Sequence, residues 1–331
     1  MRTWQVMEYG EPRDVAGIVE VAEPDAAEGE IVVAPEAVGL SLADMIMCRG
    51  RYQVRPALPY TPGFEFAGTV TAVGSGVEMA LGTRVLAIPD IPLGSRGGLA
   101  ERVPIPVANA TAIPDGMPFA VAAALPNNYV TAHLALHRRG RVAAGETVLV
   151  HGAAGGVGSA AVELAVAAGA TVIAAARGGE RVELCTALGA HYVVDTAARD
   201  FVEAVAEITD QRGADIIVDP VGGEGFALSR RAIATDGRLL VIGFPAGIGT
   251  VHANHLLLRG FSVVGVNRDL IRRLQPAVYQ AAQDDLLALW SSGGIKPAIS
   301  EIGFDQVLDG WDLLERREVV GKLVVRMNGQ P

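Results

Sequence analysis

The spacing of apolar and polar positions changes near Pro118. Before it, apolar runs are short and bounded by Gly and Pro, as in residues 31–33, 67–73 and 84–88. Short β-rich runs between turn residues are typical of strands in irregular, mostly antiparallel sheets. The first 120 or so residues are therefore predicted to form a small β domain.

After Pro118, strand-like apolar runs alternate with Ala-rich helical stretches. The predicted strands are 147–151, 171–176, 191–195, 215–219, 238–242 and 261–266. The helices between them are predicted at 158–168, 180–188 and 201–209. Near-continuously apolar strands separated by helices indicate a parallel sheet covered on both faces. The predicted fold class is α/β, with a doubly wound parallel sheet of the Rossmann type.

The segment after Asn267 contains a helical stretch at 276–290, a Gly293-Gly294 turn and a strand at 321–326. It is too short to form a domain of its own, so we expect it to pack back on the N-terminal β domain. The predicted organisation is 1–122 plus 268–331 for the β domain, with the α/β domain at 123–267 inserted into it.

Length and composition agree with a two-domain globular protein. The chain has 331 residues, half of them hydrophobic, and domains average about 150 residues. Its net charge is −10 and no stretch is rich in Lys and Arg, which argues against nucleic-acid binding.

Cys48 and Cys185 are too few for a disulfide framework or a four-thiolate zinc lobe. With no signal-peptide pattern and no membrane-length apolar run, we expect a cytoplasmic protein without a membrane partner.

The strongest motif joins the 147–151 strand to the next helix through the sequence HGAAGGVG. Its pattern, Ala153-x-Gly155-x-x-Gly158, stands where a dinucleotide fingerprint requires it. Gly155 lets the backbone approach a pyrophosphate, Gly158 lets the helix pack near its strand, and Gly156 and Val157 between them are further candidate cofactor-binding residues. The unpaired N–H groups of a helix N-terminus then face the phosphate. The motif predicts a dinucleotide site, with a purely structural turn as the alternative.

The end of the next strand bears on which dinucleotide binds. NAD-selective sites place a carboxylate there for the ribose hydroxyls, whereas this strand is followed by Arg177 and Arg181. Two guanidinium groups suit a 2′-phosphate, so NADPH is the predicted cofactor. Glu180, at the start of the next helix, counts against this prediction, and two solvated arginines are the alternative.

The sequence resembles the medium-chain dehydrogenase/reductase superfamily over essentially its whole length. The similarity is with the zinc-free quinone oxidoreductase branch, which includes zeta-crystallin. The motifs that carry it are at 58–68, 82–85, 153–158, 188–190, 237–239 and 321–324. The resemblance implies that the β domain is a GroES-like catalytic domain and that the protein is an oxidoreductase.

In zinc-dependent members of the superfamily, a Cys, a His-Glu pair and a second Cys hold the catalytic metal. The matching positions here are Ser41, Phe64-Glu65 and the 126–127 region, which lack the thiolates and the imidazole. We therefore expect no bound metal. The remaining closely spaced histidines are expected to have packing or surface roles; they are His133, His137, His252 and His255.

Without a metal to polarise a simple carbonyl, the natural hydride acceptor is a quinone or an α,β-unsaturated carbonyl, which is already electrophilic. A reductase of enoyl thioesters such as acryloyl-CoA is a close alternative, kept open by Arg49, Arg51 and Arg55 as partners for the CoA nucleotide. A third alternative is a non-catalytic, NADPH-binding structural or regulatory protein. A zinc alcohol dehydrogenase is the least favoured.

The resemblance also implies individual site residues. The cofactor's nicotinamide end would contact Thr131, Val221, Gly243, Phe244, Val266 and Asn267. Asn128, Tyr129 and Tyr52 are the candidate catalytic residues on the substrate side, although Tyr129 suits a core position equally well. Relatives of the quinone branch often carry Asn, Tyr and Arg where this chain has Ser41, Ile46 and Cys48. They commonly form dimers through the edge that corresponds to residues 261–266, so we expect a homodimer.

Overall fold

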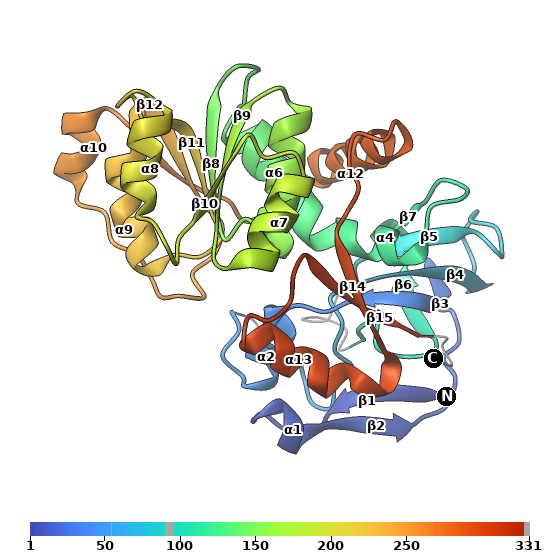
Figure 1. Cartoon of the computed structure of the whole chain (residues 1–331). Coiled ribbons are helices and arrows are strands. Elements are labelled where there is room, and N and C mark those ends of the chain that lie inside the picture. The colour runs from blue at the N-terminus through green and yellow to red at the C-terminus, as the bar shows by residue number, and fades with distance from the viewer. Residues whose placement is uncertain (54, 90–95, 328–331) are drawn as a thin grey trace. The chain divides into compact units, whose positions relative to one another are not determined.

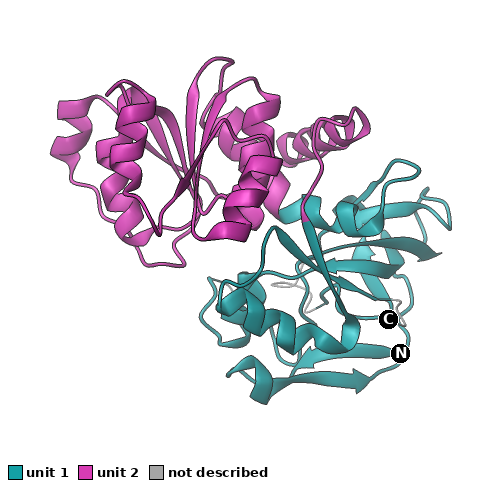
Figure 2. Cartoon of the chain, viewed as in Figure 1, with its two compact units in different colours: residues 1–127, 299–331 teal, residues 128–298 magenta. Residues whose placement is uncertain are grey.

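The structure, a computed structural model, describes residues 1–53, 55–89 and 96–327. The chain divides into two compact units, shown in Figure 2. Unit 1 contains residues 1–127 and 299–331, and unit 2 contains residues 128–298. Within the described part of the chain, no helix is long and apolar enough to cross a membrane.

Unit 2 is built on a six-stranded parallel sheet in the order β10-β9-β8-β11-β12-β13. Its strands are β8 (Thr147–His151), β9 (Thr171–Ala176), β10 (Tyr192–Asp195), β11 (Ala214–Asp219), β12 (Ile233–Val241) and β13 (Ser262–Gly265). The chain extends the sheet from β8 to one side and then returns to extend it from the other. The reversal falls between β8 and β11, and ligands of doubly wound folds bind beyond the carboxyl ends of the strands at such a point. The predicted fold class of this half is confirmed.

Helices of unit 2 follow its strands along the chain (Figure 1). They are α6 (Gly156–Ala167), α7 (Gly179–Ala187), α8 (Phe201–Ile208), α9 (Gly223–Ala232), α10 (Ala253–Arg259), α11 (Arg268–Leu274) and α12 (Pro276–Ser291). Of these, α6, α7 and α9 pack against the sheet, whereas α12 packs against other helices. These helices are preceded by a continuous helical stretch made of η2 (Leu125–Tyr129), α5 (Val130–His133) and η3 (Leu134–Arg139). Because η2 and η3 are π-helical, this stretch is wider than an ordinary α-helix.

The division into units differs from the predicted domain bounds, 1–122 plus 268–331 and 123–267, mainly at the C-terminal side. Residues 268–298 belong to unit 2, not to the β domain. The reason is that this segment packs on the helices of unit 2. The helix α12 lies against α5, where His133 Nε2 is 3.3 Å from Asp285 Oδ2. After α12, Lys296 donates its backbone N–H to Glu163 on α6 over 2.7 Å. Only the last segment, from Ile299, joins unit 1.

Unit 1 contains a seven-stranded sheet in the order β14-β15-β3-β4-β5-β7, with β6 paired to β3, and a separate β1–β2 hairpin. Its strands are β1 (Arg2–Val6), β2 (Ala16–Glu20), β3 (Glu30–Gly39), β4 (Glu65–Val73), β5 (Arg84–Ala87), β6 (Val103–Pro106), β7 (Ala110–Ala112), β14 (Ile299–Gly303) and β15 (Lys322–Arg326). Its helices include α1 (Pro12–Val15), α2 (Leu42–Cys48), α4 (Phe119–Ala124) and α13 (Val307–Glu315). Although far apart in sequence, α2 and α13 lie side by side (Figure 1). The core of the unit is centred on Trp4, Tyr60, Phe66 and Trp311.

Candidate cofactor and substrate sites

The turn between β8 and α6 has the close packing that a dinucleotide site requires. A Cβ atom on Gly158 would lie 2.1 Å from the carbonyl oxygen of Gly152, so only glycine fits there. The Ala153 backbone N–H donates to Ala175 O on β9 over 3.1 Å, which fixes the turn against the sheet. At Gly155, the N-cap of α6, an added Cβ would lie 3.3 Å from the carbonyl oxygen of Gly152, a tight contact that also favours glycine.

The first turn of α6 presents backbone donors without acceptors. The earliest helical hydrogen bond runs from Ser159 N to Gly155 O over 2.8 Å. The N–H groups of Gly156, Val157 and Gly158 make no hydrogen bond to any residue that the structure describes. Three unpaired N–H groups at the positive end of a helix suit a phosphate, so the residues present fit the diphosphate of a dinucleotide.

Arg177 and Arg181 lie where the sequence motif places the adenosine ribose, just beyond β9. The Arg181 guanidinium donates to Arg177 O over 3.2 Å, which holds the two residues near each other. Arg177 is exposed, and Arg181 is half-buried. Two cations at the end of β9 fit the 2′-phosphate of NADPH.

Sequence reasoning missed Asp195, which ends the neighbouring strand β10. Its Oδ1 accepts the backbone N–H of Ala197 over 2.9 Å and that of Gly178 over 3.2 Å. These two hydrogen bonds, with the positive charge of Arg177, hold the pKa of Asp195 below its usual range. The carboxylate is thus engaged in holding the loop after β9. Its place at the end of the strand next to β9 was the signal that could have identified it.

The ends of β11 and β12 bring further predicted residues toward the same turn. Val221 Cγ2 would lie 2.9 Å from a Cβ on Gly152, which places Val221 directly beside the phosphate-binding turn. Asp219 Oδ1 accepts the N–H groups of Val221 and Gly222, each over 2.8 Å, and so shapes this loop. Phe244 is 52% exposed and follows Gly243 on the loop after β12.

Three other predicted cofactor contacts lie on elements of the same unit. Val266 donates its N–H to Val241 O over 2.9 Å and thus continues the pairing of β13 with β12. The Asn267 side chain caps α11, because its Oδ1 accepts the Leu270 N–H over 2.9 Å. Thr131 is buried in α5. Because the side-chain oxygen of Asn267 already accepts this capping bond, a cofactor contact of Asn267 would use its side-chain NH2 group or its backbone.

Tyr129 has a different neighbour from the one expected of a substrate donor. Its hydroxyl donates to the carboxylate of Glu163 on α6, and both side chains are buried. Burial and the Glu163 charge raise the pKa of Tyr129 well above its ordinary value, and burial also raises the pKa of Glu163. Glu163 accepts a second bond from the Lys296 N–H. Through Glu163, Tyr129 links the helical stretch 125–139 to α6 and to the segment after α12, which suits a buried anchor; its catalytic role stays a prediction.

In unit 1, the candidate residues Tyr52 and Phe64 pack together, with ring centroids 5.6 Å apart. Ser41 caps α2: its N–H and its hydroxyl both donate to Asp44 Oδ2, over 3.0 and 3.1 Å. Asp44 Oδ1 accepts the Gly63 N–H over 2.9 Å. Full burial raises the pKa of Asp44 to about 6 in spite of these bonds.

The positions that match a zinc site do not fit a zinc ion. Glu65 is buried and forms an ion pair with Lys322, whose ammonium also donates to Leu40 O over 2.9 Å. The other carboxylate oxygen of Glu65 accepts the Asn127 N–H over 2.6 Å. With Ser41 bound to Asp44 and an apolar ring at Phe64, the lobe offers neither thiolate nor imidazole at these positions.

Two of the three arginines that could receive a CoA nucleotide, Arg49 and Arg55, already have partners. Arg49 forms ion pairs with Glu11 over 2.7 Å and with Glu315 over 2.8 Å. The Arg55 guanidinium lies 5.7 Å from the ring centroid of Tyr9. These contacts tie α2 and the following loop to neighbouring parts of unit 1, and they weaken the case for a nucleotide path along this surface.

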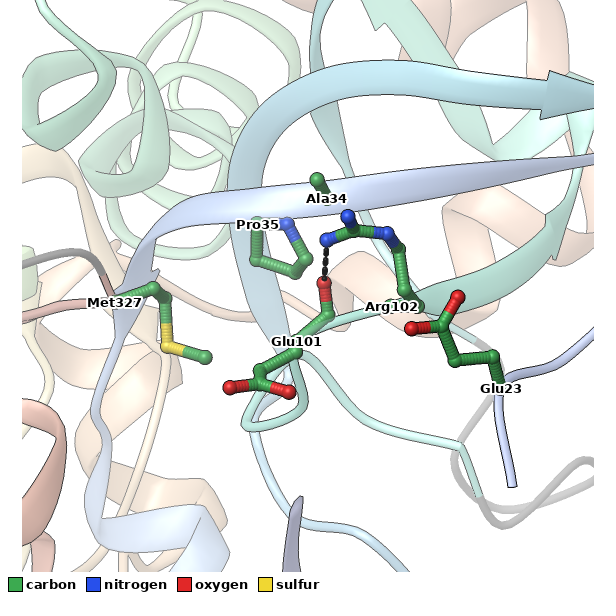
Figure 3. A pocket seen from close by; sticks show the side chains of 6 residues that line it. All are labelled: Glu23, Ala34, Pro35, Glu101, Arg102 and Met327. Atoms are coloured by element: carbon green, nitrogen blue, oxygen red, sulfur yellow. Dashed lines mark hydrogen bonds between the residues drawn. The ribbon is translucent and has the colours of Figure 1, made fainter. Parts of the chain in front are cut away.

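Two hollows on the surface contain none of the predicted catalytic residues. One, in unit 1, has a volume of about 250 Å³ and is shown in Figure 3. It is lined by Glu23, Ala34, Pro35, Glu101, Arg102 and Met327, and Arg102 donates to Glu101 O over 2.8 Å. The second, about 530 Å³, lies in unit 2 beside α9 and includes Arg230, His252 and His255.

The class of protein follows from these features: a dinucleotide-binding α/β unit inserted in a β unit. Comparison with known proteins agrees. Residues 27–115 match the alcohol dehydrogenase GroES-like domain, and residues 156–283 match the zinc-binding dehydrogenase family. The quinone oxidoreductase-like protein 2 homolog of Nematostella vectensis is 35% identical over 301 residues, covering 89% of this chain and 81% of the relative. The chain belongs to the quinone oxidoreductase branch of the medium-chain dehydrogenase/reductase superfamily, and it is an oxidoreductase.

Solved structures are similar over nearly the entire chain. The Escherichia coli quinone oxidoreductase complexed with NADPH has a TM-score of 0.89 at 27% identity, covering 99% of this chain and 100% of that one. The CurK enoyl reductase has a TM-score of 0.87 at 25% identity, covering 99% of each chain. The GroES-like and Rossmann-like domains predicted from the sequence are confirmed.

Proposed function

We propose that this protein is an NADPH-dependent, zinc-independent reductase that transfers a hydride to a quinone or an α,β-unsaturated carbonyl. The observation that carries the proposal is the Glu65–Lys322 ion pair. In it, the carboxylate at a position that matches the zinc site is already bound to a cation of the chain itself. Simple alcohols and aldehydes gain most from a Lewis acid on oxygen, whereas a conjugated acceptor is already activated. A dinucleotide site combined with a lobe unsuited to zinc favours the conjugated acceptor.

Within this proposal, unit 2 binds NADPH, which supplies the hydride. The N–H groups at the start of α6 hold the diphosphate, and Arg177 and Arg181 hold the 2′-phosphate. Thr131, Val221 and the backbone of the loop after β12 orient the nicotinamide. The NADPH complex of the E. coli quinone oxidoreductase, which shares this fold, supports the same choice of cofactor.

On the substrate side, Tyr52 is the candidate wall or hydrogen-bond donor. It is half-buried, and its ring packs on Phe64. Phe64 is buried and its ring is tilted by 58° from that of Tyr52, so the Tyr52 ring is the aromatic face that can pack against a quinone ring. Such a surface orients the acceptor by packing and leaves the oxyanion to one polar donor.

Reduction of an enoyl group is the second candidate, favoured by the likeness to the CurK enoyl reductase. It shares the conjugated C=C–C=O acceptor and the same hydride transfer. A CoA thioester is the less favoured form of it, because Arg49 is paired with two carboxylates and Arg55 lies over Tyr9.

A homodimer through β13 is part of the same proposal. β13 ends the sheet with one edge unpaired among the described residues, and α10 presents Leu257 and Leu258 at 83% and 78% exposure. An open strand edge beside exposed leucines is typical of a two-fold interface. We also propose a cytoplasmic location, to which the free thiols of Cys48 and Cys185 are suited.

The decisive experiment measures oxidation of NADPH and NADH in parallel, with an ortho-quinone, an enone and an enoyl thioester as acceptors. The assays are run with EDTA and again with added zinc. Fast NADPH oxidation with quinone or enone, unchanged by either addition, supports the proposal. Activity that EDTA abolishes and zinc restores would refute zinc independence. Binding of NADPH without turnover of any acceptor would favour a non-catalytic role.

A further inference from the structure

Asn128 lies against the phosphate-binding helix. It is in η2, and the atoms that end its side chain occupy the space beside Gly156, the first residue of α6. A Cβ atom on Gly156 would be 2.2 Å from Asn128 Nδ2 and 3.0 Å from its Cγ. Only a glycine at 156 allows this approach, so the turn and the carboxamide are matched in shape. The sequence had suggested that Asn128 faces the substrate.

The side chain of Asn128 has no hydrogen-bond partner among the residues that the structure describes. The residue as a whole is only 7% exposed, while its polar atoms are not fully enclosed. The neighbouring Tyr129 shows the usual behaviour of a buried polar group, since its hydroxyl is bound to Glu163. Buried amides in native proteins are nearly always hydrogen-bonded, so an unpartnered one beside a binding turn points to a ligand.

The neighbours of Asn128 indicate what that ligand is. Beside it are the N–H groups of Gly156, Val157 and Gly158, which also have no acceptor within the described chain. The carboxamide adds N–H donors to that group of donors at the positive end of a twelve-residue helix. Several donors without an acceptor are satisfied together by an anion with several oxygens. A carbonyl substrate offers one such oxygen, and a diphosphate offers more.

We infer that Asn128 is a cofactor ligand, whose carboxamide donates to the diphosphate of the bound dinucleotide beside the first turn of α6. This inference rests on the proposed binding of NADPH. It moves Asn128 from the substrate to the cofactor, and it gives Gly156 a specific reason to be glycine. The site thereby combines a helix N-terminus with a side chain from the junction helix.

The test measures binding by titration calorimetry, without an acceptor, for the wild type, Asn128→Ala and the nearly isosteric Asn128→Asp. The ligands are NADPH, 2′-phospho-ADP-ribose, which keeps the diphosphate, and 2′-AMP, which lacks it. Losing a hydrogen bond to a charged group predicts roughly tenfold weaker binding of the first two ligands by Asn128→Ala. Placing a carboxylate beside the diphosphate predicts about a hundredfold for Asn128→Asp. Binding of 2′-AMP should change less than about twofold.

Gln280→Ala, which removes a carboxamide from the exposed face of α12, is the matched control and should bind all three ligands as the wild type does. Circular dichroism melting establishes that each variant is folded. The inference would be overturned if Asn128→Ala and Asn128→Asp both bound 2′-phospho-ADP-ribose with wild-type affinity. This holds even if they bound NADPH more weakly, because the loss would then come from a part of the cofactor other than the diphosphate. If the wild type itself does not bind NADPH, the proposed function fails, and that outcome is separate from a failure of Asn128 alone.

Discussion

Lys322 on β15 donates its ammonium to the carboxylate of Glu65 on β4, and both side chains are almost completely buried. The pair is further satisfied by Leu40 O and by the Asn127 N–H. A buried ion pair adds little net stability compared with apolar residues, but removing one partner leaves an unpaired charge inside the protein. The lobe that would hold zinc in related enzymes thus contains a charge-balanced network of the chain's own groups.

Replacing Lys322 with Met should therefore destabilise the protein by about 3–5 kcal/mol, because Glu65 loses its buried counter-charge. Urea unfolding followed by circular dichroism measures the change. Lys296→Met is the control, since the Lys296 side chain is exposed. Adding Glu65→Gln to Lys322→Met should recover part of the loss. Equal stability of Lys322→Met and the wild type would contradict the role given to this pair.

Arg177→Ala combined with Arg181→Ala should weaken NADPH binding by about tenfold or more while leaving NADH binding unchanged. The reason is that only NADPH carries the 2′-phosphate that these guanidinium groups are proposed to bind. Fluorescence titration with each cofactor measures the ratio. Arg212→Ala, an exposed arginine of the same unit, serves as the control. A parallel loss of affinity for both cofactors would show that the arginines do not discriminate between them.

Tyr129→Phe should lower the free energy of unfolding by about 1–3 kcal/mol, because Glu163 stays buried after losing a hydrogen-bond donor. The rate of acceptor reduction should change less than twofold, since the hydroxyl faces Glu163. Thermal melting and steady-state kinetics are measured on the same preparations. Tyr192→Phe on the exposed face of β10 is the matched control. A large fall in kcat with unchanged stability would support the predicted catalytic role of Tyr129 instead.

His133 should make the protein less stable as the pH falls. Burial, together with the nearby His137, lowers its pKa to about 4 in spite of the opposing effect of Asp285, whereas an unfolded histidine titrates near 6.5. Between these values the unfolded chain binds the additional proton, so this contribution is complete above about pH 6.5 and is lost toward pH 4. The expected loss is about 3 kcal/mol. Urea unfolding at several pH values should give a flatter profile for His133→Gln; an equally steep one would contradict this assignment.

Leu257→Asp combined with Leu258→Asp should convert the proposed dimer to monomers, because two charges would be buried at the interface beside β13. Light scattering coupled to size-exclusion chromatography measures the mass. Leu81→Asp, at an exposed leucine of unit 1, should leave the mass unchanged. A monomeric wild type, or a dimeric double variant, would place the interface elsewhere or exclude it.

The parts of the fold that the sequence predicted well are those dictated by local pattern. The strands β8 and β9 begin and end at the predicted residues, because apolar runs in a buried parallel sheet are bounded by polar turns. The helix α10 was missed, since Leu257 and Leu258 are exposed and only Leu256 packs on the core, which leaves no clear apolar face. The position of 268–298 was also missed, because it depends on how α12 packs against α5, which no local pattern encodes.

For the site, glycine spacing correctly located the turn, since its backbone packing requires those residues. The partners of the polar side chains could not be predicted in the same way. Tyr129 reaches Glu163 across 34 positions of sequence, and Lys322 reaches Glu65 across 257. Such pairs are set by tertiary packing, and each residue alone is equally compatible with a catalytic role.

The strand order of unit 1 has a consequence for synthesis on the ribosome. β15 lies between β14 and β3, so the sheet of unit 1 cannot close until nearly the whole chain has been made. Unit 2, whose residues are contiguous, can fold while the later segment is still being translated. During that interval Glu65 has no counter-charge, because Lys322 has not yet emerged. A chain stopped before β15 would therefore contain a complete unit 2 and a unit 1 in which the Glu65 carboxylate still lacks the Lys322 ammonium.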